Sequence, residues 1–406
     1  MSIKTYILIL FILAAGLFNN RFTSAILSKD ISLILTFLWG IIGWVYFPRH
    51  KGNQIDNIKN RLVALGIFTS MLLSMLIPWI NYNQSILDTF ISQRFNYAIL
   101  LLLVLLRIQP RDKDIIYAIK ISAYISIIGY IISLINPTFF RSEETIKELL
   151  NMRIETDSKD IGFSGPGYSF VPIYIYIILQ QYINYPRIKK LIEASIFIVY
   201  IILVQNRSFM IGTLPFFFFC IFFTKSHHKK IIILIFIGMI IFIFPIFKPI
   251  IDSLINETQV QIADSNYNRW QAISFYLIEM KNNLSTILLG NGVWSNSGEY
   301  LQKMVMAQLT RGTYVSDIGW LGTYYYYGVF PVLILLWFAF KALIKKEVPI
   351  YLKFFSIWII TVPTIHPYLN LTTSGALEFS IYFYLIIYYM HYRELKIKQS
   401  ISLKSK

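Results

Sequence analysis

Residues 191–223 read LIEASIFIVYIILVQNRSFMIGTLPFFFFCIFF, two apolar runs joined by a short polar connection around Arg207. Each run, taken as a helix, is long enough to cross most of the roughly 30 Å of hydrocarbon in a lipid bilayer. The connection between the runs is too short for anything but a turn. This arrangement is typical of a protein that crosses a membrane several times.

The composition of the whole chain agrees with this stretch. Of 406 residues, 56% are hydrophobic and 14% are charged, whereas soluble proteins carry about 25% charged residues. A soluble globular enzyme and a disordered protein are therefore excluded, and the single cysteine, Cys220, excludes a disulfide scaffold and a Cys-based zinc site. The sequence predicts an all-α polytopic integral membrane protein with about 12 transmembrane helices. The expected spans are 5–17, 31–47, 62–80, 92–106, 115–135, 168–182, 191–204, 209–223, 231–247, 318–340, 348–362 and 376–390.

The net charge of +16 indicates how the chain is oriented. If the N-terminus is cytoplasmic, the inner segments hold about 22 basic and about 5 acidic residues, while the outer segments are close to neutral. Basic residues concentrate in cytoplasmic loops of membrane proteins, so the charge predicts that both the N- and C-termini are cytoplasmic. The positive charge is thereby explained without nucleic acid, and a nucleic-acid partner is not expected.

Two outer segments, 136–167 and 248–317, are long, and the chain is otherwise predicted to be a single membrane domain over residues 1–406. The larger segment has the pattern of two amphipathic helices, Asn268–Asn282 and Glu299–Arg311, on either side of a glycine turn. Either helix has an apolar stripe that we expect to pack on the membrane domain, although aromatic residues beside polar ones would also suit stacking on a sugar. The two stripes comprise Trp270, Ile273, Tyr276, Leu277 and Met280, and Leu301, Met304, Val305 and Leu309.

Arginines are a further feature of the outer segments, which hold Arg141, Arg153, Arg207, Arg269 and Arg311. Arg207 lies between two very apolar runs, where a guanidinium is costly unless it reaches the interface or has an anionic partner. Two interpretations stay open, an interfacial arginine and a clamp that grips phosphate through two parallel hydrogen bonds. Two interpretations of Arg153 also stay open. In the first, Arg153 ends a surface helix before a turn; in the second, a loop with several glycines brings Arg153 close to an anionic group.

The residues of the outer face favour one chemistry. Of the five histidines only His366 is expected outside, no pair there has metal-ligand spacing, and no glycine-rich phosphate loop with Lys and Ser or Thr is present. A lipid-linked sugar donor suits what remains, because arginines could neutralise its departing diphosphate without a general acid, a metal or a cofactor. A base near the acceptor hydroxyl is then needed. The candidates are Asp317 and His366, with Glu299 as a third.

The motifs also resemble a known family. Asn206-Arg207-Ser208, Arg269-Trp270-Gln271-Ala272, Leu289-Gly290-Asn291-Gly292 and Ser316-Asp317-Ile318-Gly319-Trp320-Leu321, followed by Gly328, occur in the order found in the O-antigen polymerase and ligase superfamily. The ligases of that superfamily have a His, usually as His-Asn, where this chain has Ser316-Asp317. The chain therefore resembles the Wzy-type polymerases.

The resemblance implies a membrane glycosyltransferase of the C class in the bacterial inner membrane, with no metal or cofactor. It implies that Arg207 and Arg269 contact undecaprenyl diphosphate and that Asp317, or else His366, acts on the acceptor sugar. The implied partners are an undecaprenyl-diphosphate-linked oligosaccharide, membrane lipid and a chain-length regulator. The residues expected to bind the substrate are Arg153, Arg311, Arg141, Gly290, Gly292 and Trp270.

Three other functions remain as alternatives. A flippase or other transporter also commonly has about 12 helices, but it would carry more charged residues inside its spans than Lys120, Lys353, Glu193 and Glu378. An O-antigen ligase lacks support because the His is absent. Another polyprenyl-phosphate-sugar transferase would carry acidic residues in the first outer loop, where this chain has only Asp30.

Overall fold

The computed structural model describes residues 1–16, 25–48, 55–136, 139, 166–204, 207–223, 268–281, 283–319, 321–361 and 372–404. Within these ranges the chain is all helical, without a strand. The α-helices are α1 (Ile3–Ala14), α2 (Ala25–Tyr46), α3 (Ile58–Ser74), α4 (Leu76–Tyr82), α5 (Ile86–Ser92), α6 (Leu101–Ile108), α7 (Asp112–Ile135), α9 (Val171–Asn184), α10 (Ile188–Leu203), α11 (Arg207–Phe223), α13 (Asn268–Ser274), α14 (Leu284–Leu289), α15 (Glu299–Arg311), α16 (Leu321–Tyr327), α17 (Val329–Ile344), α18 (Ile350–Thr361) and α19 (Thr373–Lys404). Shorter 3-10 helices are η1 (Arg94–Leu100), η2 (Tyr168–Phe170) and η4 (Val315–Ile318), and η3 (Phe275–Glu279) is a π-helix.

Every expected span coincides with one or more helices, apart from 231–247, which lies outside the described residues. Most of these helices are short. By length and composition three described segments are able to cross a membrane, namely Lys29–Tyr46, Ile58–Tyr82 and Asp112–Ile135, and a bent pair makes a fourth. The protein is thus a helical membrane protein, but the predicted number of about 12 complete spans is not confirmed.

Two expected spans are broken in the structure. The pair Ile86–Ser92 and Arg94–Ile108 is bent by 69°, so the expected span 92–106 is the second half of a kinked unit. The expected span 318–340 is divided by Gly328, which has φ +76° and separates α16 from α17. A positive φ cannot continue a right-handed helix, and a hydropathy pattern does not detect such a break.

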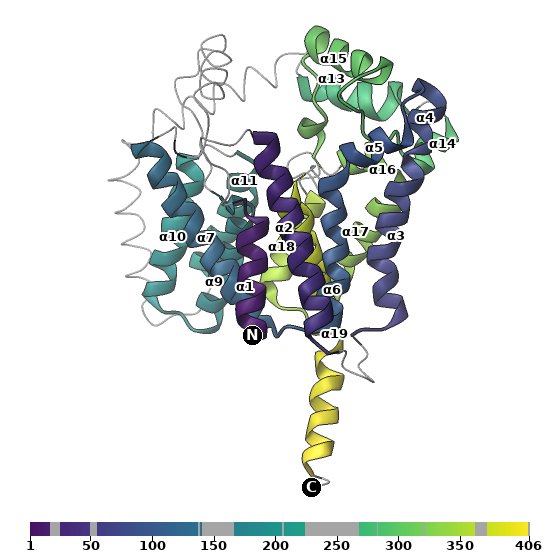
Figure 1. Cartoon of the computed structure of the whole chain (residues 1–406). Coiled ribbons are helices and arrows are strands. Elements are labelled where there is room, and N and C mark those ends of the chain that lie inside the picture. Colours follow the sequence, from purple (N-terminus) through teal and green to yellow (C-terminus); the bar gives the residue numbers. More distant parts are fainter. Residues whose placement is uncertain are drawn as a thin grey trace.

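The helices form a bundle with both chain ends on one side and a layer made by α13, α14 and α15 on the other (Figure 1). The amino group of Met1 donates to the hydroxyl of Tyr46 (2.9 Å), which joins the start of α1 to the end of α2. The hydroxyl of Tyr389 donates to Asp112 (2.7 Å), which joins α19 to the start of α7. The layer opposite the chain ends, from α13 to η4, is called the cap below.

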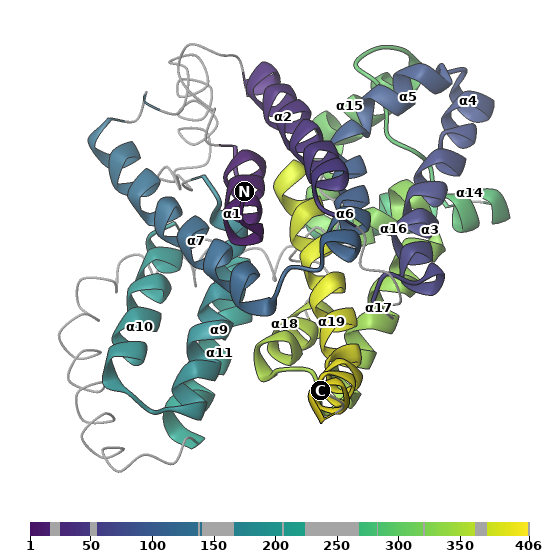
Figure 2. The same ribbon diagram turned by 60° about the horizontal axis from the view of Figure 1, so that its bottom comes forward.

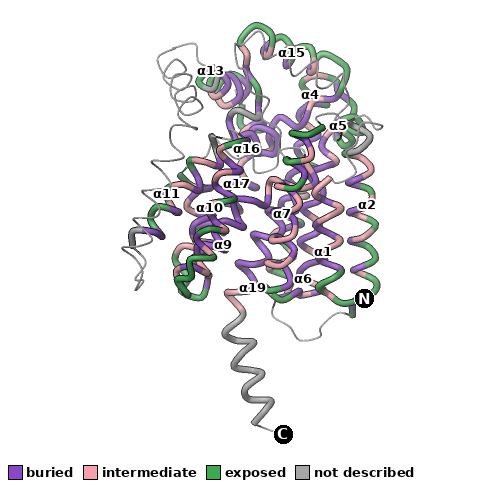
Figure 3. Tube along the Cα trace, turned by 90° about the vertical axis from the view of Figure 1, so that its left-hand side faces the viewer, coloured by how far each residue is buried: buried purple, intermediate pink, exposed green. Residues whose placement is uncertain are grey.

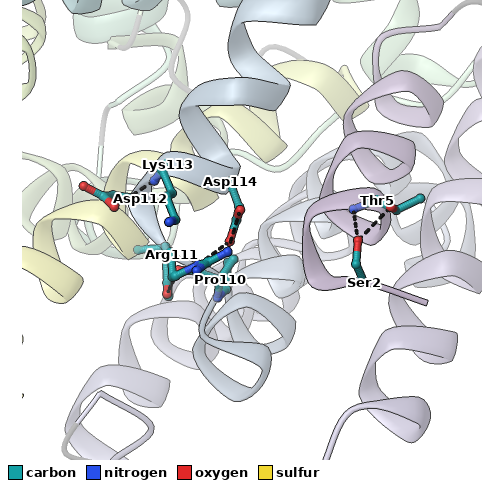
Figure 4. Close-up of polar contacts among 8 residues, drawn as sticks. Ser2, Thr5, Pro110, Arg111, Asp112, Lys113 and Asp114 are labelled. Carbon is teal, nitrogen blue, oxygen red and sulfur yellow. Dashed lines mark hydrogen bonds and ion pairs between the residues drawn. The ribbon is translucent and has the colours of Figure 1, made fainter. Parts of the chain in front are cut away.

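Helix starts on the side of the chain ends are capped locally (Figure 4). Ser2 accepts a hydrogen bond from the backbone N–H of Thr5 (3.1 Å) at the start of α1. At the start of α7, the backbone N–H of Lys113 donates to Asp112 (2.7 Å), and Asp114 forms an ion pair with Arg111 (3.0 Å). The bonds to Ser2 and Asp112 satisfy backbone N–H groups at the two helix starts, and the acidic residues in the first turn of α7 lie at the positive end of its dipole.

Helix α19 lies in the core of the bundle. All residues from 375 to 388 are buried, and the helix packs against α1, α6 and α17 (Figure 2). Large apolar side chains are exposed instead on the outer side of α2, such as Ile41 and Val45, and on α17, such as Leu333 and Trp337. Figure 3 shows this exposed side of α2 in green. Exposed apolar side chains on helices of this length are suited to contact with lipid.

The break at Gly328 yields a prediction about how the cap is held. An alanine Cβ at Gly328 would lie 2.0 Å from the carbonyl oxygen of Leu288, whereas one at Gly298 would meet nothing within 4 Å. Both glycines have backbone angles that other residues rarely adopt, with φ of +76° and +93°. Gly298→Ala should therefore cost only the backbone strain of about 1–3 kcal/mol, and Gly328→Ala should cost more. Thermal unfolding of both variants in detergent checks this, and equal losses would contradict it.

Candidate functional site

The cap is held on the membrane domain by polar and aromatic contacts with α4 and α16. The side chain of Gln84 donates to the carbonyl of Val293 (2.9 Å) and accepts from the N–H of Ser295 (2.9 Å). The ring of Tyr300 stacks on Tyr82 with 4.3 Å between ring centroids, and its hydroxyl lies 2.8 Å from that of Tyr325. These groups are buried except for Tyr82. The cap is therefore fixed to the bundle over a continuous contact.

The first apolar stripe predicted for the cap is only partly confirmed. Tyr276 and Met280 are buried, but Trp270 is 62% exposed. The buried residues Ala272, Phe275, Tyr276 and Met280 have helical spacing, so they define a face that is rotated away from Trp270. The π-helix η3, in which the N–H of Met280 bonds to the carbonyl of Phe275 (2.9 Å), begins only after Trp270. The buried face of this segment contains Ala272 and Phe275 instead of Trp270.

The second helix of the cap has the predicted bounds, Glu299–Arg311, but its buried face is displaced. Tyr300, Met304 and Ala307 are buried, whereas Leu309 is 77% exposed. The spacing of the buried residues is helical, so the displacement amounts to a small rotation toward Tyr300. The predicted stripe was thus right at Met304 and wrong at Leu309.

The turn Gly290-Asn291-Gly292 packs against the end of α16. The N–H of Asn291 donates to the carbonyl of Tyr325 (2.7 Å) and the N–H of Gly292 to that of Tyr326 (2.9 Å). A Cβ on Gly290 would lie 2.3 Å from the carbonyl oxygen of Tyr326. Both glycines therefore have a packing role in the structure, and the substrate-binding role predicted for them stays a prediction.

The structure brings together the elements that carry two of the predicted catalytic residues. Arg269 is in α13 and Asp317 is in η4, and these two elements pack against each other. The side chains of Arg269 and Asp317 lie outside the described part of the chain. The backbone therefore locates both residues in one region of the cap.

Arg311 lies at the end of α15, close to this region. Its guanidinium forms an ion pair with Glu279, with N–O distances of 2.7 and 2.9 Å. Both side chains are nearly half exposed, and exposed pairs stabilise a protein by about 0–1 kcal/mol. The pair orders the guanidinium at little energetic gain.

Arg207 lies in the bundle and not in the cap, at the start of α11. Two residues later, Phe209 stacks on Tyr168 with 4.8 Å between centroids and meets Trp358 edge-on at 5.5 Å. Trp358 is near the end of α18, which ends at Thr361. The side chain of Arg207, and all of Arg141, Arg153 and His366, lie outside the described residues.

Lys281, which the sequence analysis missed, is buried between the cap and α16. Its Nζ donates to the carbonyls of Thr286 and Tyr324, the latter at 3.0 Å, and lies 4.2 Å from the centre of the Tyr324 ring. Burial lowers the pKa of Lys281 to about 7. A neutral amine has two N–H donors, which suffice for the two carbonyls. Nothing in the sequence distinguishes this lysine from an exposed one.

The described residues contain no group of three or more His, Cys, Asp or Glu side chains that could hold a metal ion.

The burial of Lys281 makes stability depend on pH. Its pKa in the folded protein, about 7, is below the ordinary value of 10.5, so between these values the unfolded chain binds more protons than the folded one. Stability should therefore rise with pH in this window, by up to about 1.4 kcal/mol per pH unit for one such group. Lys281→Met should flatten the rise, measured as the melting temperature in detergent from pH 7 to 10.

Lys303→Met is the matched control, because Lys303 is an exposed lysine of the same cap. It should leave the slope unchanged. The same slope in the Lys281→Met variant and in the unaltered protein would contradict the effect attributed to Lys281.

No family model matches the chain, and no curated protein matches it significantly.

Proposed function

We propose that the chain is a polysaccharide polymerase of the O-antigen type in the bacterial inner membrane. It would transfer a growing glycan from undecaprenyl diphosphate onto a lipid-linked repeat unit at the periplasmic face. The observation that carries the proposal is the packing of α13 against η4, which holds the segments of Arg269 and Asp317 together on the side opposite the chain ends. The basic inner segments favour the periplasm for that side.

The proposed reaction is a displacement at the reducing-end sugar of the growing glycan. A hydroxyl oxygen of the incoming repeat unit attacks the anomeric carbon, the bond from that carbon to the diphosphate oxygen breaks, and undecaprenyl diphosphate leaves with the bonding electrons. Asp317 is proposed to take the hydroxyl proton. Arg207 and Arg269 are proposed to stabilise the diphosphate, because a guanidinium forms two parallel hydrogen bonds with phosphate oxygens.

The proposed substrate also suits the architecture. The donor and the acceptor each have a prenyl tail, a diphosphate and a sugar chain, and therefore need an apolar, a cationic and a polar surface in sequence. The bundle offers apolar helix faces, and the cap offers exposed polar and aromatic groups such as Trp270, Tyr314 and Arg311. Aromatic rings of this kind support contact with sugars.

One observation favours a second candidate, a flippase for lipid-linked oligosaccharide. Glu378 is buried in α19 within the bundle, and ionisable residues at such positions commonly line a transport path. The two candidates are separated by reconstitution with repeat units already on the outer face of the vesicle. Elongation there supports the polymerase, and transport without elongation supports the flippase.

Replacement of the arginines tests the proposed clamp. Arg207→Ala and Arg269→Ala should each lower the rate of elongation by about a hundred- to a thousandfold, because one charged donor to the transition state is lost. The lysine variants should recover only part of the rate, since an ammonium cannot form the paired bonds. Polymer length on a gel and elongation by purified protein measure the effect. Lys303→Ala is the control, and full-length polymer from both arginine variants would refute the clamp.

Replacement of the carboxyl group tests the proposed base. Asp317→Asn keeps the size of the side chain and removes its ability to take a proton, so elongation should fall by about a hundred- to ten-thousandfold. The melting temperature in detergent should stay near that of the unaltered protein. Unchanged elongation would move the role of base to His366, which His366→Ala would then test.

A further inference from the structure

Two helices end inside the bundle well before their neighbours do. The hydroxyl of Ser32 in α2 donates to the carbonyl of Leu13 in α1 (2.5 Å), so these two residues lie at the same level. Helix α1 ends at Ala14, whereas α2 extends from Ser32 back to Ala25. At 1.5 Å per residue, α2 continues for about 10 Å beyond the end of α1. The end of α1 is therefore inside the molecule.

The start of α9 lies at the same place. A Cβ on Gly167 would be 3.1 Å from the carbonyl oxygen of Ser122, in the middle of α7, and 3.6 Å from the Cβ of Ala15. Helix α7 continues from Ser122 to Ile135, which is about 20 Å. The continuous helical unit of η2 and α9 therefore begins about 20 Å below the outer end of α7. Helix starts inside a membrane protein leave N–H groups without a partner in their own helix and often form binding sites.

Tyr168 and Ser169 belong to this helix start, and Ser122 belongs to the part of α7 against which Gly167 packs. The oxygens of Ser122, Tyr168 and Ser169 are buried, and none has a hydrogen-bond partner among the described residues. Ser122 is 1% exposed. A buried hydroxyl without a partner typically costs about 1–3 kcal/mol. Groups of this kind in a folded protein indicate a ligand or water that completes their hydrogen bonds.

Other hydroxyls of the same elements are satisfied within the protein, which makes these three distinct. On α7 the hydroxyl of Ser133 donates to the carbonyl of Gly129 (2.9 Å), and that of Ser126 lies 2.7 Å from the hydroxyl of Tyr200. The ring of Tyr168 is fixed between Tyr200, edge-on at 5.5 Å, and Phe209. Its hydroxyl is thus held in place by aromatic packing and not by a hydrogen bond to any residue that the structure describes.

A cationic residue begins the neighbouring helix. Arg207 is two residues before Phe209, which stacks on the ring of Tyr168. The end of α1 brings carbonyl groups to the same level, and one of them, that of Leu13, is occupied by Ser32. A helix start, three hydroxyl donors and an arginine nearby suit a phosphate group, since each donates to or attracts an anionic oxygen.

We propose that Ser122, Tyr168 and Ser169, at the start of the η2 and α9 unit, bind the diphosphate of the prenyl-linked donor next to Arg207. The identification of the phosphate as a prenyl diphosphate rests on the proposed function. The location suits such a ligand, because the prenyl tail stays in the hydrocarbon while the diphosphate reaches the buried hydroxyl groups inside the bundle. The hydroxyls position the donor, and none of them takes part in a covalent step.

The test is binding of farnesyl diphosphate to the purified protein in phosphatidylcholine nanodiscs. Tyr168→Phe keeps the ring that packs on Phe209 and removes only the hydroxyl, so affinity should fall about ten- to a hundredfold. Ser122→Ala and Ser169→Ala should act in the same direction. The controls are Ser133→Ala on α7 and Tyr97→Phe, whose hydroxyls bond to carbonyls of Gly129 and Phe90, and neither should alter binding.

A second measurement separates binding from a structural role. Since the hydroxyl of Tyr168 has no partner among the described residues, Tyr168→Phe without ligand should melt at the same or a higher temperature. Added farnesyl diphosphate should raise the melting temperature of the unaltered protein more than that of the variant. A lower melting temperature of the ligand-free variant, together with unchanged binding, would overturn the proposal.

Competition identifies the source of the phosphate. If the site takes a prenyl diphosphate, inorganic pyrophosphate should displace farnesyl diphosphate only weakly. Phosphatidylglycerol in the nanodisc should also displace it only weakly. Displacement at equal concentration by either one would overturn that assignment. Unchanged affinity of Tyr168→Phe beside normal elongation refutes this site but not the polymerase. Loss of affinity in the variant, with no elongation by the unaltered protein, supports the site and refutes the polymerase.

Discussion

The backbone contact between the glycine turn of the cap and the end of α16 is the constraint on which the arrangement depends. Gly328 lies against the carbonyl of Leu288, and Gly290 lies against the carbonyl of Tyr326, so neither position has room for a side chain. Contacts between backbones leave little freedom to slide, unlike contacts between flexible side chains. This contact sets the height of α13 and η4 above the bundle, and with it the height of Arg269 and Asp317.

The candidate residues belong to two levels of the molecule. Arg269, Asp317 and Arg311 are in the cap, while Arg207 is in the bundle, two residues before the Phe209 that stacks on Tyr168. Under the proposed function, a substrate that extends from the bundle into the cap would meet an apolar, a cationic and a polar surface with its tail, its diphosphate and its sugars. The tyrosines of α16 connect the levels, since Tyr325 and Tyr326 accept hydrogen bonds from the cap and belong to the helix that precedes the membrane-facing α17.

The sequence was sufficient to predict the helices but not to predict which of them are broken inside the bundle. Apolar runs and the amphipathic helix Glu299–Arg311 were predicted because burial and helical period leave a pattern in the chain. A hydropathy pattern does not distinguish a complete span from a half helix followed by a turn, so the break at Gly328 was missed, whereas the expected span 168–182 begins where η2 does, at Tyr168. The exposure of Trp270 was missed because the apolar spacing of this segment fits two faces, and the buried one contains Ala272 and Phe275. Lys281 was missed because burial of a lysine depends on distant residues such as Tyr324, and the roles of Arg207, Arg269 and Asp317 stay predictions.

The position of α19 has a consequence for biogenesis. This helix occupies the centre of the bundle over residues 375–388, yet it is synthesised after all the other described helices. The earlier helices must therefore enter the membrane before α19 does, and the centre of the bundle stays unfilled until α19 has been translated. Chains in that interval expose apolar and polar groups that are enclosed later, and exposed groups of this kind make incompletely folded chains prone to aggregate.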